Sequence, residues 1–142
     1  MNTKEIQYHL SDTTALISLL SDLRSSCQVF AFTGPLGAGK TTLSRMLLRQ
    51  WGVQEAITSP TFIYVNCYKN NSDQLFYHFD LYRIASLNEF IEQGFNEYLY
   101  QNNSWALIEW PEVIFPLLTH NVCFITLDYR GEQERTATIS WL

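Results

Sequence analysis

Residues 34–41 have the types and the spacing of a loop that binds phosphate. They read Gly-Pro-Leu-Gly-Ala-Gly-Lys-Thr, a complete Gly-x-x-x-x-Gly-Lys-Thr pattern. The glycines let the backbone adopt positive φ and approach a phosphate with no Cβ in the way, while successive N–H groups point at the anion. Lys40 can reach the β- and γ-phosphates from a solvent-facing position, and the Thr41 hydroxyl can bind Mg²⁺. The loop therefore predicts ATP or ADP and Mg²⁺ as cofactors.

The segments on either side of this loop fit the same interpretation. Residues 29–32 form a short apolar run that predicts a strand, and residues 42–51 predict a helix that Gly52 ends. The N-terminal dipole of such a helix favours a bound phosphate. The loop residues that we expect to contact the nucleotide are Pro35, Leu36, Gly37, Ala38, Gly39, Lys40, Thr41 and Thr42.

Two carboxylates follow or lie within β-rich runs, where they could serve hydrolysis. Hydrolysis needs a second acid at the metal and a group that positions the attacking water. Glu109 follows the apolar run 105–108, the usual place for a metal-site acid, and Asp80 lies in the run 75–82. We expect Thr41 and Glu109 to bind the metal. Each carboxylate could instead be a solvated strand end.

A polar loop after the predicted helix is a candidate switch. Ser59, Pro60 and Thr61 lie where a loop that senses the γ-phosphate would be expected. The alternative is an ordinary loop rich in hydroxyl groups.

The elements that must position these residues can be read along the chain. Tyr8–Leu10 predicts a short strand or an extended lead-in, and Ser11 or Asp12 can cap a helix that runs to about Ser25. That helix carries an apolar face of leucines expected in the core. These leucines are Leu16, Leu19, Leu20 and Leu23.

The second half of the chain predicts mostly strands. Residues 62–68 and 75–82 predict a hairpin, 105–108 a central parallel strand, and 122–127 with 136–141 a closing hairpin. Residues 87–100 predict one or two short helices broken near Gly94, and Pro116 should interrupt any helix after Pro111. We therefore expect an α/β fold: one P-loop NTPase domain over residues 1–142, with a mixed parallel and antiparallel sheet flanked by helices.

Composition excludes several classes of function. The chain has 142 residues, a net charge of −5 and only three lysines, so it offers no basic stripe for nucleic acid. The cysteines lack close spacing, which favours free thiols in a reducing compartment over a zinc site. No apolar run is long enough for a membrane span, and the N-terminus lacks a signal-peptide pattern. We expect a cytoplasmic protein without membrane contact. The three cysteines are Cys27, Cys67 and Cys123.

Four motifs occur in a characteristic order. They are 34–42, Ser-Pro-Thr-Phe at 59–62, His-Phe-Asp-Leu-Tyr-Arg at 78–83 and Ile-Glu-Trp-Pro-Glu at 108–112. Over nearly its whole length the chain resembles the TsaE (YjeE) family of bacterial ATPases for tRNA threonylcarbamoyladenosine biosynthesis. The third and fourth of these motifs are far more specific than the P-loop.

The resemblance implies roles that composition does not give. It implies a weak cytoplasmic ATPase that acts with the TsaB–TsaD heterodimer, so that tRNA is reached only through the complex. It implies that Asp80 and Glu109 serve hydrolysis with Lys40, that Trp110 lies near the nucleotide, and that Thr13 lies near the adenosine.

Two other functions share the P-loop. A small-molecule kinase could use Asp80 as a base toward a substrate hydroxyl, but the chain has no arginine-rich lid segment. A binding module that does not hydrolyse nucleotide could use ATP to order the loop around Pro60. Phosphate release in the absence of an acceptor separates these alternatives.

Overall fold

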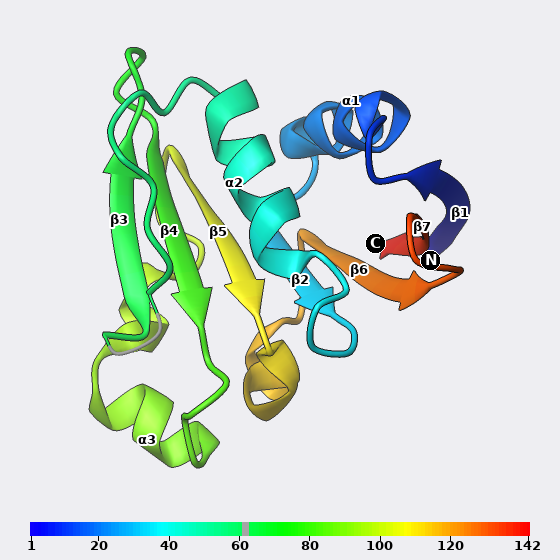
Figure 1. The fold of residues 1–142 in the computed structure, drawn as a ribbon. Coiled ribbons are helices and arrows are strands. Elements are labelled where there is room, and N and C mark those ends of the chain that lie inside the picture. The colour runs from blue at the N-terminus through cyan, green and yellow to red at the C-terminus, as the bar shows by residue number, and fades with distance from the viewer. Residues whose placement is uncertain (61–62) are drawn as a thin grey trace.

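A computed structural model describes residues 1–60 and 63–142 of the chain. Within them, one seven-stranded sheet has the order β1-β7-β6-β2-β5-β4-β3 (Figure 1). The strands are β1 (Asn2–His9), β2 (Val29–Thr33), β3 (Val65–Lys69), β4 (Leu75–Asp80), β5 (Ser104–Glu109), β6 (Val122–Tyr129) and β7 (Glu134–Trp141). The helices are α1 (Thr14–Asp22), α2 (Lys40–Gln50) and α3 (Leu87–Glu92), with 3-10 helices η1 (Leu23–Ser25), η2 (Phe95–Tyr98) and η3 (Pro111–Leu117).

The centre of the sheet is parallel and its edges are antiparallel. Strand β2 pairs in parallel with both β5 and β6, and β4 pairs in parallel with β5. Antiparallel pairing adds β3 on one side and β7 with β1 on the other. The predicted fold class, a single α/β domain with a mixed sheet, is therefore confirmed. The carboxyl ends of β2, β4 and β5 lie together, at the edge where open α/β sheets bind ligands.

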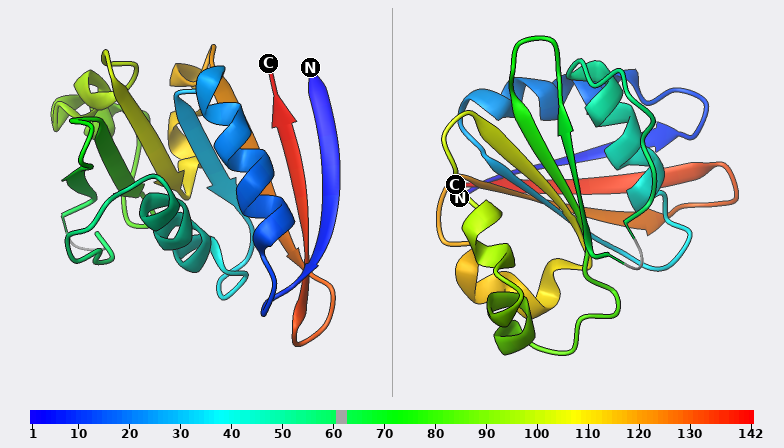
Figure 2. Two further views of the ribbon diagram at one scale, coloured as in Figure 1. Left: turned by 90° about the horizontal axis from the view of Figure 1, so that it is seen from above. Right: turned by 90° about the vertical axis from the view of Figure 1, so that its left-hand side faces the viewer.

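Helices cover both faces of this sheet. Figure 2 shows α1 and α2 on one face and α3 with η2 and η3 on the other. Alternate residues of β2 supply both cores, with Phe30 and Phe32 facing α2, and Val29 and Ala31 facing α3. Because β2 is buried on both faces, its sequence is continuously apolar, as a central parallel strand requires.

Most predicted elements are confirmed, including the hairpins, the central strand and the break at Gly94, whose φ is +78°. The short strand predicted at Tyr8–Leu10 is wrong in extent. Strand β1 begins at Asn2, because its whole length pairs with β7. The N-cap position of α1 is Thr13 rather than the predicted Ser11 or Asp12, but it is the Asp12 Oδ1 atom that accepts from the backbone N–H of Thr14, at 3.1 Å.

Smaller differences concern ends and burial. Strand β4 ends at Asp80 rather than Tyr82, and η3 continues through Pro116, which a 3-10 turn accommodates. Cys27 and Cys123 are buried free thiols as expected, whereas Cys67 is exposed. Across the described residues, the helices are all too short or too polar to cross a membrane.

Candidate functional site

The loop that the sequence predicts to bind phosphate connects β2 to α2, with Gly39 as the N-cap of the helix at a φ of +106°. Gly34 has a φ of +141°, and a Cβ built there would collide with the carbonyl oxygen of Leu127 on β6. Glycine is therefore required at Gly34 by both the backbone conformation and the close approach of a neighbouring strand. The local sequence produces the loop that the pattern predicts, with the first turn of α2 directly behind it.

Lys40 is buried, with 5% of its surface exposed, so the expectation of a solvent-facing side chain was wrong. Its ammonium donates to the carbonyl oxygens of Gly34 and Pro35, and it lies 3.7 Å from the ring centroid of Trp110. Burial lowers the pKa of Lys40, and three nearby carboxylates, with Glu109 acting most strongly, oppose this shift. The Lys40 ammonium is therefore held next to the Trp110 ring by hydrogen bonds to two carbonyl groups of the loop.

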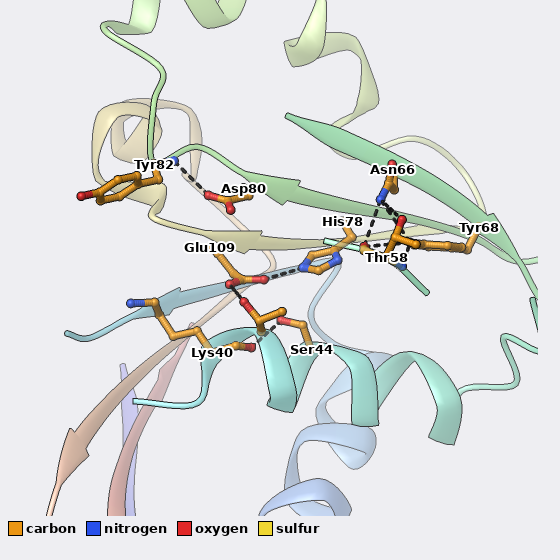
Figure 3. Close-up of polar contacts among 10 residues, drawn as sticks. Lys40, Ser44, Thr58, Asn66, Tyr68, His78, Asp80, Tyr82 and Glu109 are labelled. Carbon is orange, nitrogen blue, oxygen red and sulfur yellow. Dashed lines mark hydrogen bonds and ion pairs between the residues drawn. The ribbon is translucent and has the colours of Figure 1, made fainter. Parts of the chain in front are cut away.

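Thr41 and Glu109 meet directly. The Thr41 hydroxyl donates to Glu109 Oε1 at 2.5 Å, and His78 Nε2 lies 2.6 Å from Glu109 Oε2 (Figure 3). Both Glu109 and His78 are buried. The parallel pairing of β4 with β5 and of β5 with β2 brings these residues to the first turn of α2.

Asp80 lies beside Glu109, because the two residues are paired in the β4–β5 register. Its Oδ1 accepts a hydrogen bond from the backbone N–H of Tyr82 at 3.0 Å. Burial raises the pKa of the Asp80 carboxyl, and the negative charge of Glu109 raises it further. Two carboxylates are therefore held close together at the end of the central strands, in different environments.

Most of the predicted site residues line one cavity of about 470 Å³. The cavity opens over the phosphate-binding loop and the carboxyl ends of β4 and β5. Its lining consists of Leu36, Gly37, Gly39, Lys40, Thr41, Thr42, Ser59, Asp80, Tyr82, Arg83, Glu109 and Trp110.

Thr13 lies elsewhere around the loop. It lines a second cavity of about 250 Å³, which shares Gly37, Gly39 and Thr42 with the first. Ala38 also lines this second cavity. Thr13 is therefore separated from the carboxylates but adjoins the same loop.

The predicted switch loop lies partly at the site. Ser59 lines the larger cavity and Pro60 is buried, while Thr61 lies outside the described residues. The preceding Thr58 is tied to β3, since its backbone N–H donates to the hydroxyl of Tyr68 at 3.1 Å. Asn66 also donates to the carbonyl of Thr58 at 3.0 Å (Figure 3). These contacts anchor one end of the loop to β3.

Sequence reasoning assigned no role to two residues that the structure places here. Tyr82 packs on Trp110 with ring centroids 5.0 Å apart, and His78 contacts Glu109. Strand alternation could have indicated His78, because it lies two residues before Asp80 and so shares its face of β4. The role of Tyr82 depends on the fold, since Trp110 belongs to another segment.

The oxygen atoms at this site suit Mg²⁺. The Thr41 hydroxyl and the Glu109 carboxylate provide hard oxygen donors at one point beside the loop. The described part of the chain contains no group of three acidic, histidine or cysteine side chains that could hold a metal alone. In proteins Mg²⁺ commonly uses one or two protein oxygens together with nucleotide phosphates and water.

Comparisons with known proteins agree with one another. The family model described as "Threonylcarbamoyl adenosine biosynthesis protein TsaE" matches residues 8–137. Proteins named "tRNA threonylcarbamoyladenosine biosynthesis protein TsaE" include one from Rickettsia felis, 37% identical over 90% of this chain and 74% of its own length. The Haemophilus influenzae protein is 41% identical over 75% of this chain and 66% of its own length. The Bacillus subtilis protein is 30% identical over 91% of this chain and 79% of its own length.

A solved structure has the same fold. The crystal structure of YdiB from Bacillus subtilis superimposes with a TM-score of 0.66 at 22% identity. The match covers 98% of this chain and 86% of the YdiB chain.

Proposed function

The chain belongs to the TsaE family, and from this premise we propose that it binds and hydrolyses ATP as an accessory protein in tRNA threonylcarbamoyladenosine biosynthesis. The observation that carries the proposal is the contact of Thr41 with Glu109, 2.5 Å apart at the start of α2. This pair supplies a hydroxyl and a carboxylate where the phosphates of a bound nucleotide would lie.

Each residue of the site has a task in this proposal. The loop N–H groups and Lys40 bind the phosphates, and Thr41 with Glu109 would hold Mg²⁺, which neutralises charge that develops on the phosphoryl oxygens. Asp80 orients the attacking water and accepts its proton, a task suited to a carboxyl whose pKa burial raises above its ordinary value. Lys40 must exchange its carbonyl partners for phosphate oxygens when nucleotide binds.

The partner in this proposal is the TsaB–TsaD heterodimer, in the cytoplasm. A net charge of −5 does not favour direct binding to tRNA, and one of the three lysines is buried at the nucleotide site. We therefore assign contact with the tRNA to the partner proteins. The activity of the chain alone should be weak and should rise when the partners bind.

The test is phosphate release from ATP by the purified protein, with and without TsaB–TsaD. We expect slow release alone, faster release with the heterodimer, and release about 100-fold slower or worse from the Glu109→Gln variant under either condition. Formation of ADP that requires an added small-molecule acceptor, with the phosphoryl group transferred to that acceptor and not released as phosphate, would indicate a kinase. Nucleotide binding without release, even with the partners, would indicate a binding module and contradict the proposed ATPase.

Trp110 should report nucleotide binding by fluorescence. Its ring lies 3.7 Å from the Lys40 ammonium, so movement of that charge toward a phosphate changes the field at the indole. We expect Mg²⁺-ATP to change the emission of the wild type, and Trp110→Phe to lose that change while remaining folded. Trp141→Phe, at the end of β7, is the control and should keep the full change. An undiminished change in Trp110→Phe would contradict this placement.

Asp80→Asn should raise the thermal unfolding midpoint at neutral pH while reducing phosphate release about 100-fold or more. The folded-state pKa of Asp80 is raised above its ordinary value of 3.8. The folded protein therefore binds this proton more tightly than the unfolded chain, and the resulting stabilisation is lost as pH rises through the raised pKa. Asparagine removes the half-buried charge and keeps the oxygen that accepts from Tyr82.

The measurement is the unfolding midpoint of both proteins from pH 4 to pH 8. The advantage of the variant should shrink as pH falls, because Asp80 of the wild type then becomes protonated. A midpoint lower than that of the wild type at neutral pH would show that the charge stabilises the fold.

A further inference from the structure

His78 is a fully buried histidine at this site. The proposed mechanism of hydrolysis gives it no role. It lies on β4 with 0% of its surface exposed, two residues before Asp80. Strand alternation places both residues on the face of β4 that looks toward α2. Figure 3 shows the imidazole directed at the carboxylate of Glu109, with Lys40 at the other side of that carboxylate.

The two oxygens of Glu109 have different partners. Oε1 accepts from the Thr41 hydroxyl at 2.5 Å, and Oε2 lies 2.6 Å from His78 Nε2. An ionised carboxylate is only an acceptor, so the Nε2 atom carries the hydrogen and donates it. The carboxylate is therefore held at both ends, with Oε1 on the side of Thr41 and the phosphate-binding loop.

Glu109 is the only hydrogen-bond partner of the His78 ring in the part of the chain that the structure describes. The Nδ1 atom is buried and makes no hydrogen bond with any described residue. Leaving a buried polar atom unpaired costs free energy, and an apolar side chain of similar size would avoid that cost in this strand. The packing of the sheet therefore does not explain the imidazole, whereas its contact with Glu109 does.

We propose that His78 is a positioning residue that holds Oε2 of Glu109 and thereby presents Oε1 to a divalent cation beside Thr41. This inference rests on the proposed function. Residues that orient a metal ligand through a hydrogen bond commonly change metal affinity by about 10- to 100-fold when they are removed. The effect of His78 should be confined to the metal, because among the described residues the ring forms its hydrogen bond with Glu109 and none with the loop 34–41.

The experiment measures binding of Mn²⁺, by electron paramagnetic resonance, to the full chain saturated with ADP. His78→Leu keeps an apolar group of moderate size but removes the donor, and should raise the Mn²⁺ dissociation constant about 10- to 100-fold. His78→Gln can place an amide N–H near the position of Nε2, and should stay within roughly threefold of the wild type. Affinity for ADP without metal should be unchanged in both variants.

A double-mutant comparison separates positioning from a structural role. In the Glu109→Ala background, His78→Leu should cause no further loss of Mn²⁺ affinity, because the carboxylate that His78 positions is already absent. Equal losses in both backgrounds, or wild-type Mn²⁺ affinity in His78→Leu, would overturn the inference.

If His78→Leu does not fold, judged by circular dichroism, His78→Asn replaces it. Its amide is too short to reach Oε2, so it should bind Mn²⁺ weakly where His78→Gln binds it well. Equal affinity in the Asn and Gln variants would again overturn the inference. Absence of Mn²⁺ binding by the wild-type protein with ADP would instead contradict the proposed function itself.

Discussion

Lys40→Ala loses nucleotide affinity while the protein stays folded. A charge-assisted contact to phosphate contributes about 1.5–3 kcal/mol, which corresponds to roughly 10- to 150-fold in the dissociation constant. The fold should survive because the buried ammonium is not paired with a carboxylate by any hydrogen bond among the described residues, and its partners are two loop carbonyls. The measurement is calorimetric titration with ADP and ATP, together with the thermal unfolding midpoint.

Lys40→Met is the matched control for packing under Trp110. Methionine fills the space of the lysine stem against the indole without the charge. Because burial lowers the pKa of Lys40, its charged form is disfavoured in the folded protein, and Met should unfold at or above the wild-type temperature. Both variants should lose nucleotide affinity alike. Wild-type affinity in either folded variant would remove Lys40 from the nucleotide site.

Glu109→Gln should retain most of its affinity for ATP but release phosphate about 100-fold more slowly or worse, the size of effect seen when a preorganised electrostatic group is lost. The loop backbone and Lys40 supply most of the phosphate contacts, whereas the charge of Glu109 acts at the metal. Glutamine has the shape of glutamate and can still form hydrogen bonds with both Thr41 and His78. In the wild type, Glu109 Oε1 lies 2.5 Å from the Thr41 hydroxyl, and Oε2 lies 2.6 Å from His78 Nε2. The change therefore isolates the charge.

Single-turnover phosphate release and ATP titration measure the two effects separately. Glu109→Asp is the companion variant, because its shorter side chain keeps the charge but cannot span Thr41 and His78 together. It should lie between the wild type and the glutamine variant. Near wild-type release by Glu109→Gln would make Glu109 an ordinary strand end and Asp80 the leading metal-site acid.

The sequence by itself determined those features that depend on neighbouring residues. The glycine and lysine spacing of 34–41 specified the loop, since positive φ at Gly34, Gly37 and Gly39 is a local requirement. Apolar runs predicted the central strands, and Gly94 predicted the break between α3 and η2. The run 105–108 also indicated that Glu109 lies at a strand end, because a strand end is a local property. Asp80 lay inside the predicted strand 75–82, whereas it ends β4 in the structure.

Only the tertiary structure decided which side chains meet. Thr41 and Glu109 are 68 residues apart and His78 and Glu109 are 31 apart, so their contacts depend on strand order and register. The burial of Lys40 likewise depends on Trp110. This residue follows β5, far along the chain from Lys40, and the fold places its ring next to the Lys40 ammonium. The extent of β1 was missed because its exposed sequence has little apolar alternation, and it is pairing with β7 along its length that extends it. Such pairing is a property of two segments together, and neither sequence alone specifies it.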